Sequence, residues 1–149
     1  MPAISLEQQA FLALVRTQSE LGSDFERLFR EHGLSTATYN TLSVLKAAGV
    51  MGQKCQDIGE HLMAVTPDVT RLIDRLQASG LCARVRSKTD RRVVMVRITQ
   101  AGLDVLARLE GPVRELHASQ LGHLSREQLR SLIDLLAACR AVATDRDGA

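Results

Sequence analysis

Residues 66–99 read TPDVTRLIDRLQASGLCARVRSKTDRRVVMVRIT, and this stretch decides the fold because its hydrophobic period changes halfway. In the first half, four apolar residues recur at the spacing of one helical face: Val69, Leu72, Ile73 and Leu76. Thr66 fits the N-cap, Pro67 fits the first helical position, and Gly80 supplies a C-terminal stop. The pattern therefore predicts a helix over residues 66–79.

The second half alternates with a period of two, which is typical of a strand with one buried face. Over residues 81–87 we expect one series to face inward, namely Leu81, Ala83 and Val85. The other series should face outward, namely Cys82, Arg84 and Arg86. Over residues 93–99 we expect Val94, Val96 and Ile98 to be buried. The five residues between the runs are enough for a loop, so the stretch ends in a β-hairpin.

The flanking sequence is helical. Apolar spacing predicts a helix over residues 5–31, a second helix from a Ser35 cap to Gly49, and a short helix over about 54–62. A long helix should begin after a Thr99 cap, and Pro112 should kink or divide it. The last helix begins at SREQ, where Ser125 and Gln128 have the spacing of a capping box.

Charge is distributed unevenly along this chain of 149 residues, whose net charge is only +2. From Arg71 to Arg97 there are eight basic and two acidic residues, a balance of +6, so the remainder carries −4. A basic segment inside an otherwise acidic chain is a footprint for a polyanion.

A short helix, a turn, a sharply capped helix and a hairpin are the parts of a winged helix-turn-helix, whose second helix enters the major groove of DNA. The candidate DNA-binding residues of that helix are Thr66, Pro67, Asp68, Thr70, Arg71 and Arg75. Those of the wing are Arg84, Arg86, Lys88, Asp90, Arg91 and Arg92. We expect Arg91 and Arg92 to reach a minor groove and Arg84, Arg86 and Lys88 to contact phosphates. Asp90 should pair with a nearby arginine.

These motifs resemble the MarR family of bacterial winged-helix regulators over nearly the whole chain. TPDVTRLIDRLQASGLCARVRS is similar to that family's recognition helix and first wing strand, and DRRVVMVRIT is similar to its wing pattern. The resemblance implies a mainly α (α+β) fold and a homodimer that binds double-stranded DNA at a pseudo-palindrome. Residues 34–98 would form the winged lobe, and residues 1–33 and 99–149 the helical dimerisation domain.

Wide apolar stripes on the terminal helices favour a subunit interface. The candidate dimerisation residues are Phe11, Leu14, Leu129, Leu132, Ile133 and Leu136. Many members of the family respond to small phenolic or aromatic acids, and in this chain Arg16, His32 and Tyr39 could approach such a ligand crevice. Repression that a small ligand relieves is therefore the expected function.

Two alternatives remain open. Cys55, at the start of a helix, could sense oxidants, whereas Cys82 should face outward and Cys139 should pack in a core. A winged-helix protein adaptor is the second alternative. No hydrolase, P-loop or metalloprotease motif is present, and the cysteines and histidines have no zinc-ligand spacing. We therefore expect no enzyme, no metal and no cofactor. The absence of a secretory signal and of a membrane span makes the cytoplasm the expected compartment.

Overall fold

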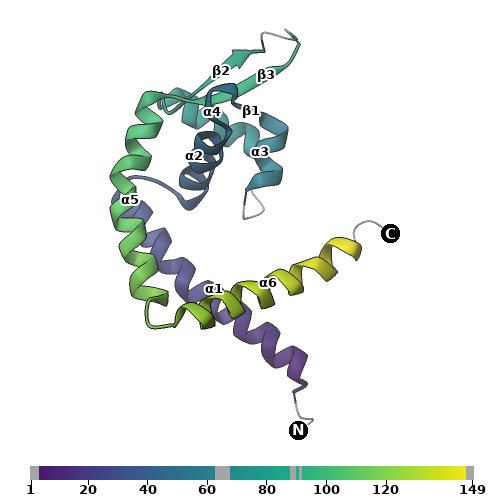
Figure 1. Cartoon of the computed structure of the whole chain (residues 1–149). Coiled ribbons are helices and arrows are strands. Elements are labelled where there is room, and N and C mark those ends of the chain that lie inside the picture. Colours follow the sequence, from purple (N-terminus) through teal and green to yellow (C-terminus); the bar gives the residue numbers. More distant parts are fainter. Residues whose placement is uncertain (1–3, 63–67, 88–89, 91, 147–149) are drawn as a thin grey trace. The chain divides into compact units, whose positions relative to one another are not determined.

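The computed structural model describes residues 4–62, 68–87, 90 and 92–146 (Figure 1). Its elements are α1 (Leu6–Glu31), α2 (Thr36–Ala48), a 3-10 turn (Gly49–Met51), β1 (Gln53–Lys54), α3 (Cys55–His61), α4 (Val69–Ala78), β2 (Cys82–Arg86), β3 (Val94–Ile98), α5 (Gln100–Leu121) and α6 (Arg126–Arg146). The predicted mainly helical fold with a β-hairpin is confirmed.

The contacts within the chain divide it into two compact units, residues 1–113 and residues 114–149. The first unit holds α1 to α4, the sheet and the first part of α5; the second holds the end of α5 and α6. The boundary lies inside α5, between Val113 and Arg114. The division into a winged lobe at 34–98 and flanking dimerisation helices remains a prediction about function.

The β-sheet has three antiparallel strands in the order β1-β3-β2. β2 and β3 form the predicted hairpin, with Cys82 opposite Ile98 and Arg84 opposite Val96. β1 was not predicted, because two residues are too few to show a period. It pairs Gln53 with Val96 at the other edge of β3, so it joins the wing to the start of α3.

The core of the first unit lies between the sheet and helices α2, α3 and α4. Its buried side chains are Leu42, Leu45, Ile58, Leu72, Ile73, Leu76, Cys82, Val96 and Leu106. The predicted stripe of α4 supplies three of them. The helix then ends in a Schellman motif, in which the N–H of Leu81 donates to the carbonyl of Leu76 at 2.9 Å and Gly80 has a φ of 72°. This turn directs the chain into β2.

The predicted facing of β2 is wrong. Cys82 is buried and Val85 is exposed, the reverse of what the alternation suggested. Residues opposite each other in an antiparallel pair share one face of the sheet, so Cys82 and Arg84 lie on the face of the fully buried Val96. Both alternating series contain small apolar residues, and only the packing of the helices decides which face is covered.

The start of α5 is fixed to the end of α4. Thr99 is the predicted cap: its hydroxyl accepts from the N–H of Gly102 at 3.2 Å and donates to the carbonyl of Gly80 at 2.6 Å. Gly102 is buried, and a Cβ atom built on it would meet the carbonyl oxygen of Leu81 and lie 2.7 Å from Cγ1 of Ile98. Only a glycine lets the helix approach the hairpin this closely.

Of the two long C-terminal helices, α5 differs from the sequence prediction and α6 confirms it. α5 runs through Pro112 as one helix, so the predicted division is not found. The capping box at α6 is confirmed in both directions: the N–H of Ser125 donates to Oε1 of Gln128 at 2.8 Å, and the N–H of Gln128 donates to the Ser125 hydroxyl at 3.2 Å. Cys139 is exposed rather than packed in a core, because the apolar stripe of α6 is largely uncovered within this single chain.

We expect Gly102→Ala to lower the free energy of unfolding by roughly 1–3 kcal/mol, because the added methyl group would overpack the junction. Urea denaturation followed by circular dichroism measures this change. Gly111→Ala is the matched control in the same helix, since a Cβ there meets nothing within 4 Å, and its effect should stay within about 1 kcal/mol. Equal stabilities of the two variants would contradict the close approach.

Candidate nucleic-acid interface

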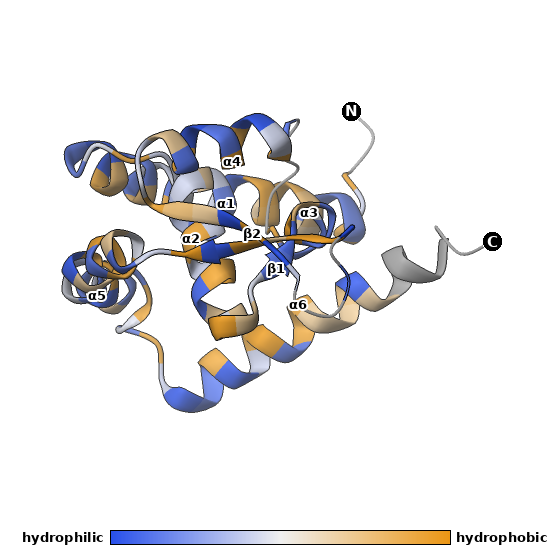
Figure 2. Cartoon of the chain, turned by 90° about the horizontal axis from the view of Figure 1, so that it is seen from above, coloured by the Kyte–Doolittle hydropathy of each residue, from blue (hydrophilic) through white to orange (hydrophobic). Residues whose placement is uncertain are grey.

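One face of α4 is polar and exposed, and the opposite face is buried. The exposed residues are Asp68, Thr70, Arg71, Asp74 and Arg75, as expected for the side opposite the predicted apolar stripe. In Figure 2 hydrophilic segments follow this helix on the side away from the core. Arg71 and Arg75 are one turn apart and therefore project from the same side. The helix thus presents two guanidinium groups to solvent on a rigid element.

Asp68 is the N-cap of α4, which begins at Val69 rather than two residues earlier. Its carboxylate accepts from the backbone N–H of Arg71 at 2.9 Å and lies 3.0 Å from Nε of the same residue. The predicted cap at Thr66 is therefore replaced by Asp68, a stronger cap that also holds Arg71. Thr66 and Pro67 themselves lie outside the described residues.

The wing is closed by a turn in which Asp90 binds backbone groups. The Asp90 carboxylate accepts from the backbone N–H of Arg92 at 2.9 Å, and the Asp90 carbonyl accepts from the N–H of Val93 at 3.0 Å. Among the described residues no ion pair of Asp90 with an arginine is found. The carboxylate instead reaches the amide two residues ahead, as in an Asx turn. A pairing of Asp90 with Arg91 falls outside the described residues and stays a prediction.

Two of the predicted wing cations, Arg86 and Arg92, are exposed to solvent. Arg92 is exposed beside the turn, and Arg86 is exposed at the end of β2. Lys88 and Arg91 lie outside the described residues. The turn fixed by Asp90 therefore sets the backbone from which Arg92 projects.

Arg84 is not a free cation of the wing. Its guanidinium donates to Oδ1 of Asp74 at 2.6 Å and to Oε1 of Gln77 at 2.7 Å. Both acceptors lie on α4, so Arg84 connects the wing strand to the recognition helix. The sequence prediction missed this contact, because ten residues and a tight turn separate Arg84 from Asp74.

Of the three residues predicted for a ligand crevice, Arg16 lies apart from His32. Arg16 lies within α1 and His32 is its C-cap, so the rise of about 1.5 Å per residue places them about 24 Å apart. Tyr39 stacks on Phe29, with ring centroids 4.4 Å apart, and so helps to pack α1 against α2. None of the three residues lines the pocket found between α1 and α2.

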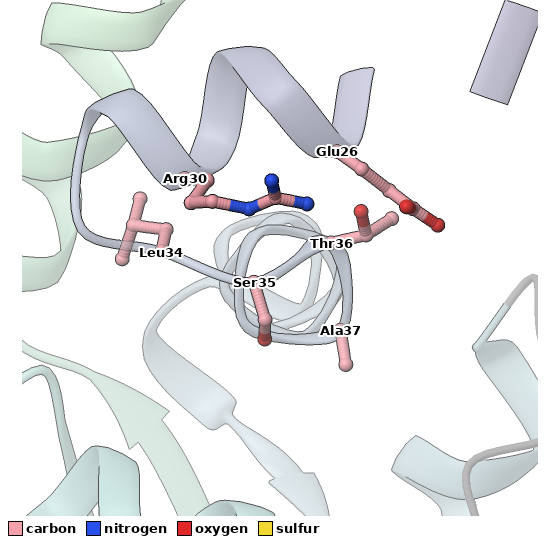
Figure 3. A pocket seen from close by; sticks show the side chains of 6 residues that line it. All are labelled: Glu26, Arg30, Leu34, Ser35, Thr36 and Ala37. Carbon is pink, nitrogen blue, oxygen red and sulfur yellow. The ribbon is translucent and has the colours of Figure 1, made fainter. Parts of the chain in front are cut away.

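An open pocket of about 360 Å³ lies instead between α1 and the start of α2. It is lined by Glu26, Arg30, Leu34, Ser35, Thr36 and Ala37. Figure 3 shows the guanidinium of Arg30 extending over the first turn of α2, toward the side where Glu26 and Thr36 lie. The hydroxyl of Thr36 is buried without a hydrogen-bond partner among the described atoms. The pocket thus combines a cation, a carboxylate and an unsatisfied hydroxyl.

Four of the six predicted dimerisation residues are exposed in the single chain. Phe11 is 63% exposed and Ile133 is 62% exposed. Leu14 and Leu132 are also exposed, and Leu129 and Leu136 are half-buried. Such apolar side chains on two long helices are typical of a surface that another subunit covers.

The cysteines differ in environment. Cys55 is half-buried at the start of α3, a helix of seven residues. Burial raises the pKa of the Cys82 thiol, which makes it a poor nucleophile at neutral pH. Within the described ranges no cluster of side chains could hold a metal ion, and no helix has the length and apolar character needed to cross a membrane.

The chain is similar to known regulators over most of its length. The sequence profile of the MarR family matches residues 34–94. The HTH-type transcriptional repressor IacR of Pseudomonas putida is 28% identical over 130 residues, which cover 87% of this chain and 77% of IacR.

Solved structures extend this similarity. A MarR transcription factor from Planctomyces limnophilus is 43% identical, with a TM-score of 0.68, and the match covers 90% of this chain and 97% of that chain. The S. aureus MepR–DNA complex has a TM-score of 0.73 over 94% of this chain and 99% of that chain. At 16% identity the second likeness shows the fold alone.

Replacing the cap of α4 tests the geometry of its first turn. We expect Asp68→Ala to lower the free energy of unfolding by about 1 kcal/mol, because a backbone N–H loses its acceptor. Asp68→Asn keeps a capping oxygen and should retain most of this stability. Thermal and urea unfolding of the two variants would measure the difference, and an alanine variant as stable as the parent would rule out Asp68 as the cap.

Proposed function

The chain belongs to the MarR family of DNA-binding transcriptional regulators, and we propose that it is a homodimeric repressor of a pseudo-palindromic operator that a small ligand relieves. Its relatives are transcription regulators and not enzymes. Binding to bacterial DNA would place the protein in the cytoplasm. The observation that carries the proposal is the paired guanidinium face of α4 beside an arginine-bearing wing.

The recognition helix would enter the major groove with Arg71 and Arg75 toward the bases. An arginine can bind guanine O6 and N7 with two hydrogen bonds. The Thr70 hydroxyl can donate to an acceptor or accept from a donor on a base edge. The ion pair with Asp68 holds Arg71 in one orientation before DNA arrives. Less side-chain entropy is then lost on binding.

The wing would reach the adjacent minor groove with Arg92. A narrow A·T-rich groove concentrates negative potential and attracts an arginine side chain. Arg86 would contact phosphates, which position the protein without reading sequence. We also assign Lys88 to a phosphate contact and Arg91 to the minor groove. Thr66 and Pro67, which precede α4, are kept as DNA-binding residues of the recognition helix.

Dimerisation would use the exposed apolar faces of α1 and α6. A two-fold dimer of winged lobes places two recognition helices about 34 Å apart, one turn of DNA. Burial of Phe11 and Ile133 against a second copy would supply the apolar contact that the single chain lacks. The similarity to the repressor IacR supports repression as the regulatory outcome.

The pocket between α1 and α2 is the proposed ligand site. Its volume of about 360 Å³ lies within the range of pockets that bind small molecules. Arg30 would bind a carboxylate, and Glu26 would accept a hydrogen bond from a hydroxyl of the same ligand. A small hydroxylated aromatic acid meets both requirements. These pocket residues replace the crevice predicted from Arg16, His32 and Tyr39.

Selection of bound sequences from random DNA duplexes, at two salt concentrations, tests the proposed function. An enriched inverted repeat with half-sites one turn apart is the expected result. Binding should weaken steeply as salt rises, since phosphate contacts release counterions. Addition of 2-hydroxybenzoate should then weaken binding to the selected operator.

Failure of the selection would point to another class of protein. If folded and dimeric protein enriches no sequence with or without 2-hydroxybenzoate, the winged-helix adaptor becomes the better interpretation. Binding that salt does not affect would also contradict the assigned role of the arginines.

Arg92→Ala should weaken binding to the selected operator by roughly 1–3 kcal/mol, because the wing loses its exposed groove contact. The dimer mass should not change, since Arg92 is far in sequence from the apolar faces of α1 and α6. Fluorescence anisotropy with the selected duplex measures the loss. An affinity equal to that of the parent would exclude the wing from DNA recognition.

Ile133→Asp should shift the protein from dimer to monomer, because a buried unpaired charge is costly in an interface. Ile133 is exposed in the single chain, so the monomer should stay folded. Ser131→Asp adds the same charge on the opposite face of α6 and is the matched control. Light scattering after gel filtration gives the mass, and a full dimer for Ile133→Asp would show that this face is not the interface.

A further inference from the structure

The wing strand and the recognition helix are joined by one side chain. Arg84 of β2 lies 2.6 Å from Oδ1 of Asp74 and 2.7 Å from Oε1 of Gln77. Asp74 and Gln77 are three residues apart on α4 and so lie on the same side of that helix. One guanidinium therefore bridges two points of the recognition helix through two different nitrogens.

The sheet register directs Arg84 toward this helix. Arg84 is paired with Val96, whose side chain is fully buried on the core face of the sheet. Its side chain is 28% exposed, whereas the side chain of Arg71 is 83% exposed. Arg84 therefore extends along the edge of the core toward α4, and most of its surface is already covered by protein.

α4 is otherwise held by an apolar stripe and by its end turn. Leu72, Ile73 and Leu76 fix which face is buried, but aliphatic contacts are not directional and permit small rotations and shifts of the helix. A two-point hydrogen-bonded clamp defines a direction that apolar packing does not. It also neutralises Asp74, whose carboxylate would otherwise stand on the face turned to a polyanion.

We propose that Arg84 is a positioning residue for DNA recognition, which clamps α4 to the wing so that the base-reading arginines and Arg92 keep a fixed spacing. The proposal rests on the proposed DNA-binding function and revises the phosphate contact that the sequence suggested for Arg84. A phosphate contact adds affinity for every DNA sequence. A clamp adds affinity chiefly for the sequence that matches the fixed geometry.

The variant Arg84→Lys separates these two roles. Lysine keeps the positive charge and binds phosphate as a point charge, but it lacks the planar fork that spans two acceptors. For a clamp, we expect affinity for the selected operator to fall by about fivefold or more. Affinity for a scrambled duplex, and the slope of affinity against salt, should be those of the parent. Equal loss on both duplexes, or no loss on either, would overturn the proposal.

Arg86→Gln is the reference variant on the same strand for the loss of a phosphate contact. Arg86 lies two residues from Arg84, on the same face of β2, and is exposed. Its replacement should weaken both duplexes by a similar factor and reduce the salt slope by about one. If Arg84→Gln gives this same pattern, Arg84 is a phosphate contact and the clamp is excluded.

A double-mutant cycle with Asp74→Asn tests whether Arg84 acts through Asp74. The loss of operator affinity caused by Arg84→Lys should be clearly smaller in the Asp74→Asn background, because the partner has already been changed. Strictly additive effects on operator affinity would overturn the proposal. Circular dichroism and the unfolding midpoint must match the parent in each variant, so that a folding defect is not read as lost recognition.

The outcome also distinguishes this inference from the proposed function. If the parent protein selects no operator, the DNA-binding function fails before any variant is compared. If the parent selects an operator and Arg84→Lys binds it as tightly as the parent does, the function stands and the clamp fails.

Discussion

The burial of one stripe of α4 is the constraint on which the rest of the structure depends. Leu72, Ile73 and Leu76 pack against α2, α3 and the covered face of the sheet, and this packing leaves the opposite side of the helix to water. The charged side chains are exposed because the apolar ones are buried. The Schellman turn at Gly80 then sends the chain into β2, and Thr99 ties the start of α5 back to the same turn. The recognition helix, wing and long helix are consequently fixed to one another near a single point.

Three aspartates stand among the arginines of the proposed DNA-binding surface, and each one orders a basic element. Asp68 caps α4 and holds Arg71. Asp74 receives Arg84, and Asp90 closes the turn that presents Arg92. A carboxylate near DNA is unfavourable when it is free, but here two of the three are paired with a cation and the third accepts from the backbone. Negative charge in this site therefore serves to preorganise positive charge, which reduces the entropy lost when a groove is occupied.

The junction at Gly102 connects the sheet to the helices that are proposed to form the dimer. Because no side chain fits between α5 and the hairpin, the first turns of α5 are held tightly against the winged unit. The exposed apolar residues of α1 and α6 lie on long helices, where a second copy can cover them. The pocket beside Arg30 lies between α1 and α2, at the place where a proposed dimerisation helix meets the winged lobe. A ligand there would contact both functional parts of the chain.

The sequence by itself determined the features that depend on neighbours within one or two turns. These are the helices and most of their ends, the Thr99 cap, the capping box of Ser125 and Gln128, the buried stripe of α4 and the hairpin. Its charge pattern also located the basic surface. Only the tertiary structure decided that Cys82 faces the core, that β1 joins the sheet, that Asp90 binds an amide and Arg84 binds Asp74, and that Arg16 and His32 stand apart. The physical reason is that hydrophobic period and capping are local, whereas the covered face of a strand and the partner of a long side chain depend on segments that meet only after folding.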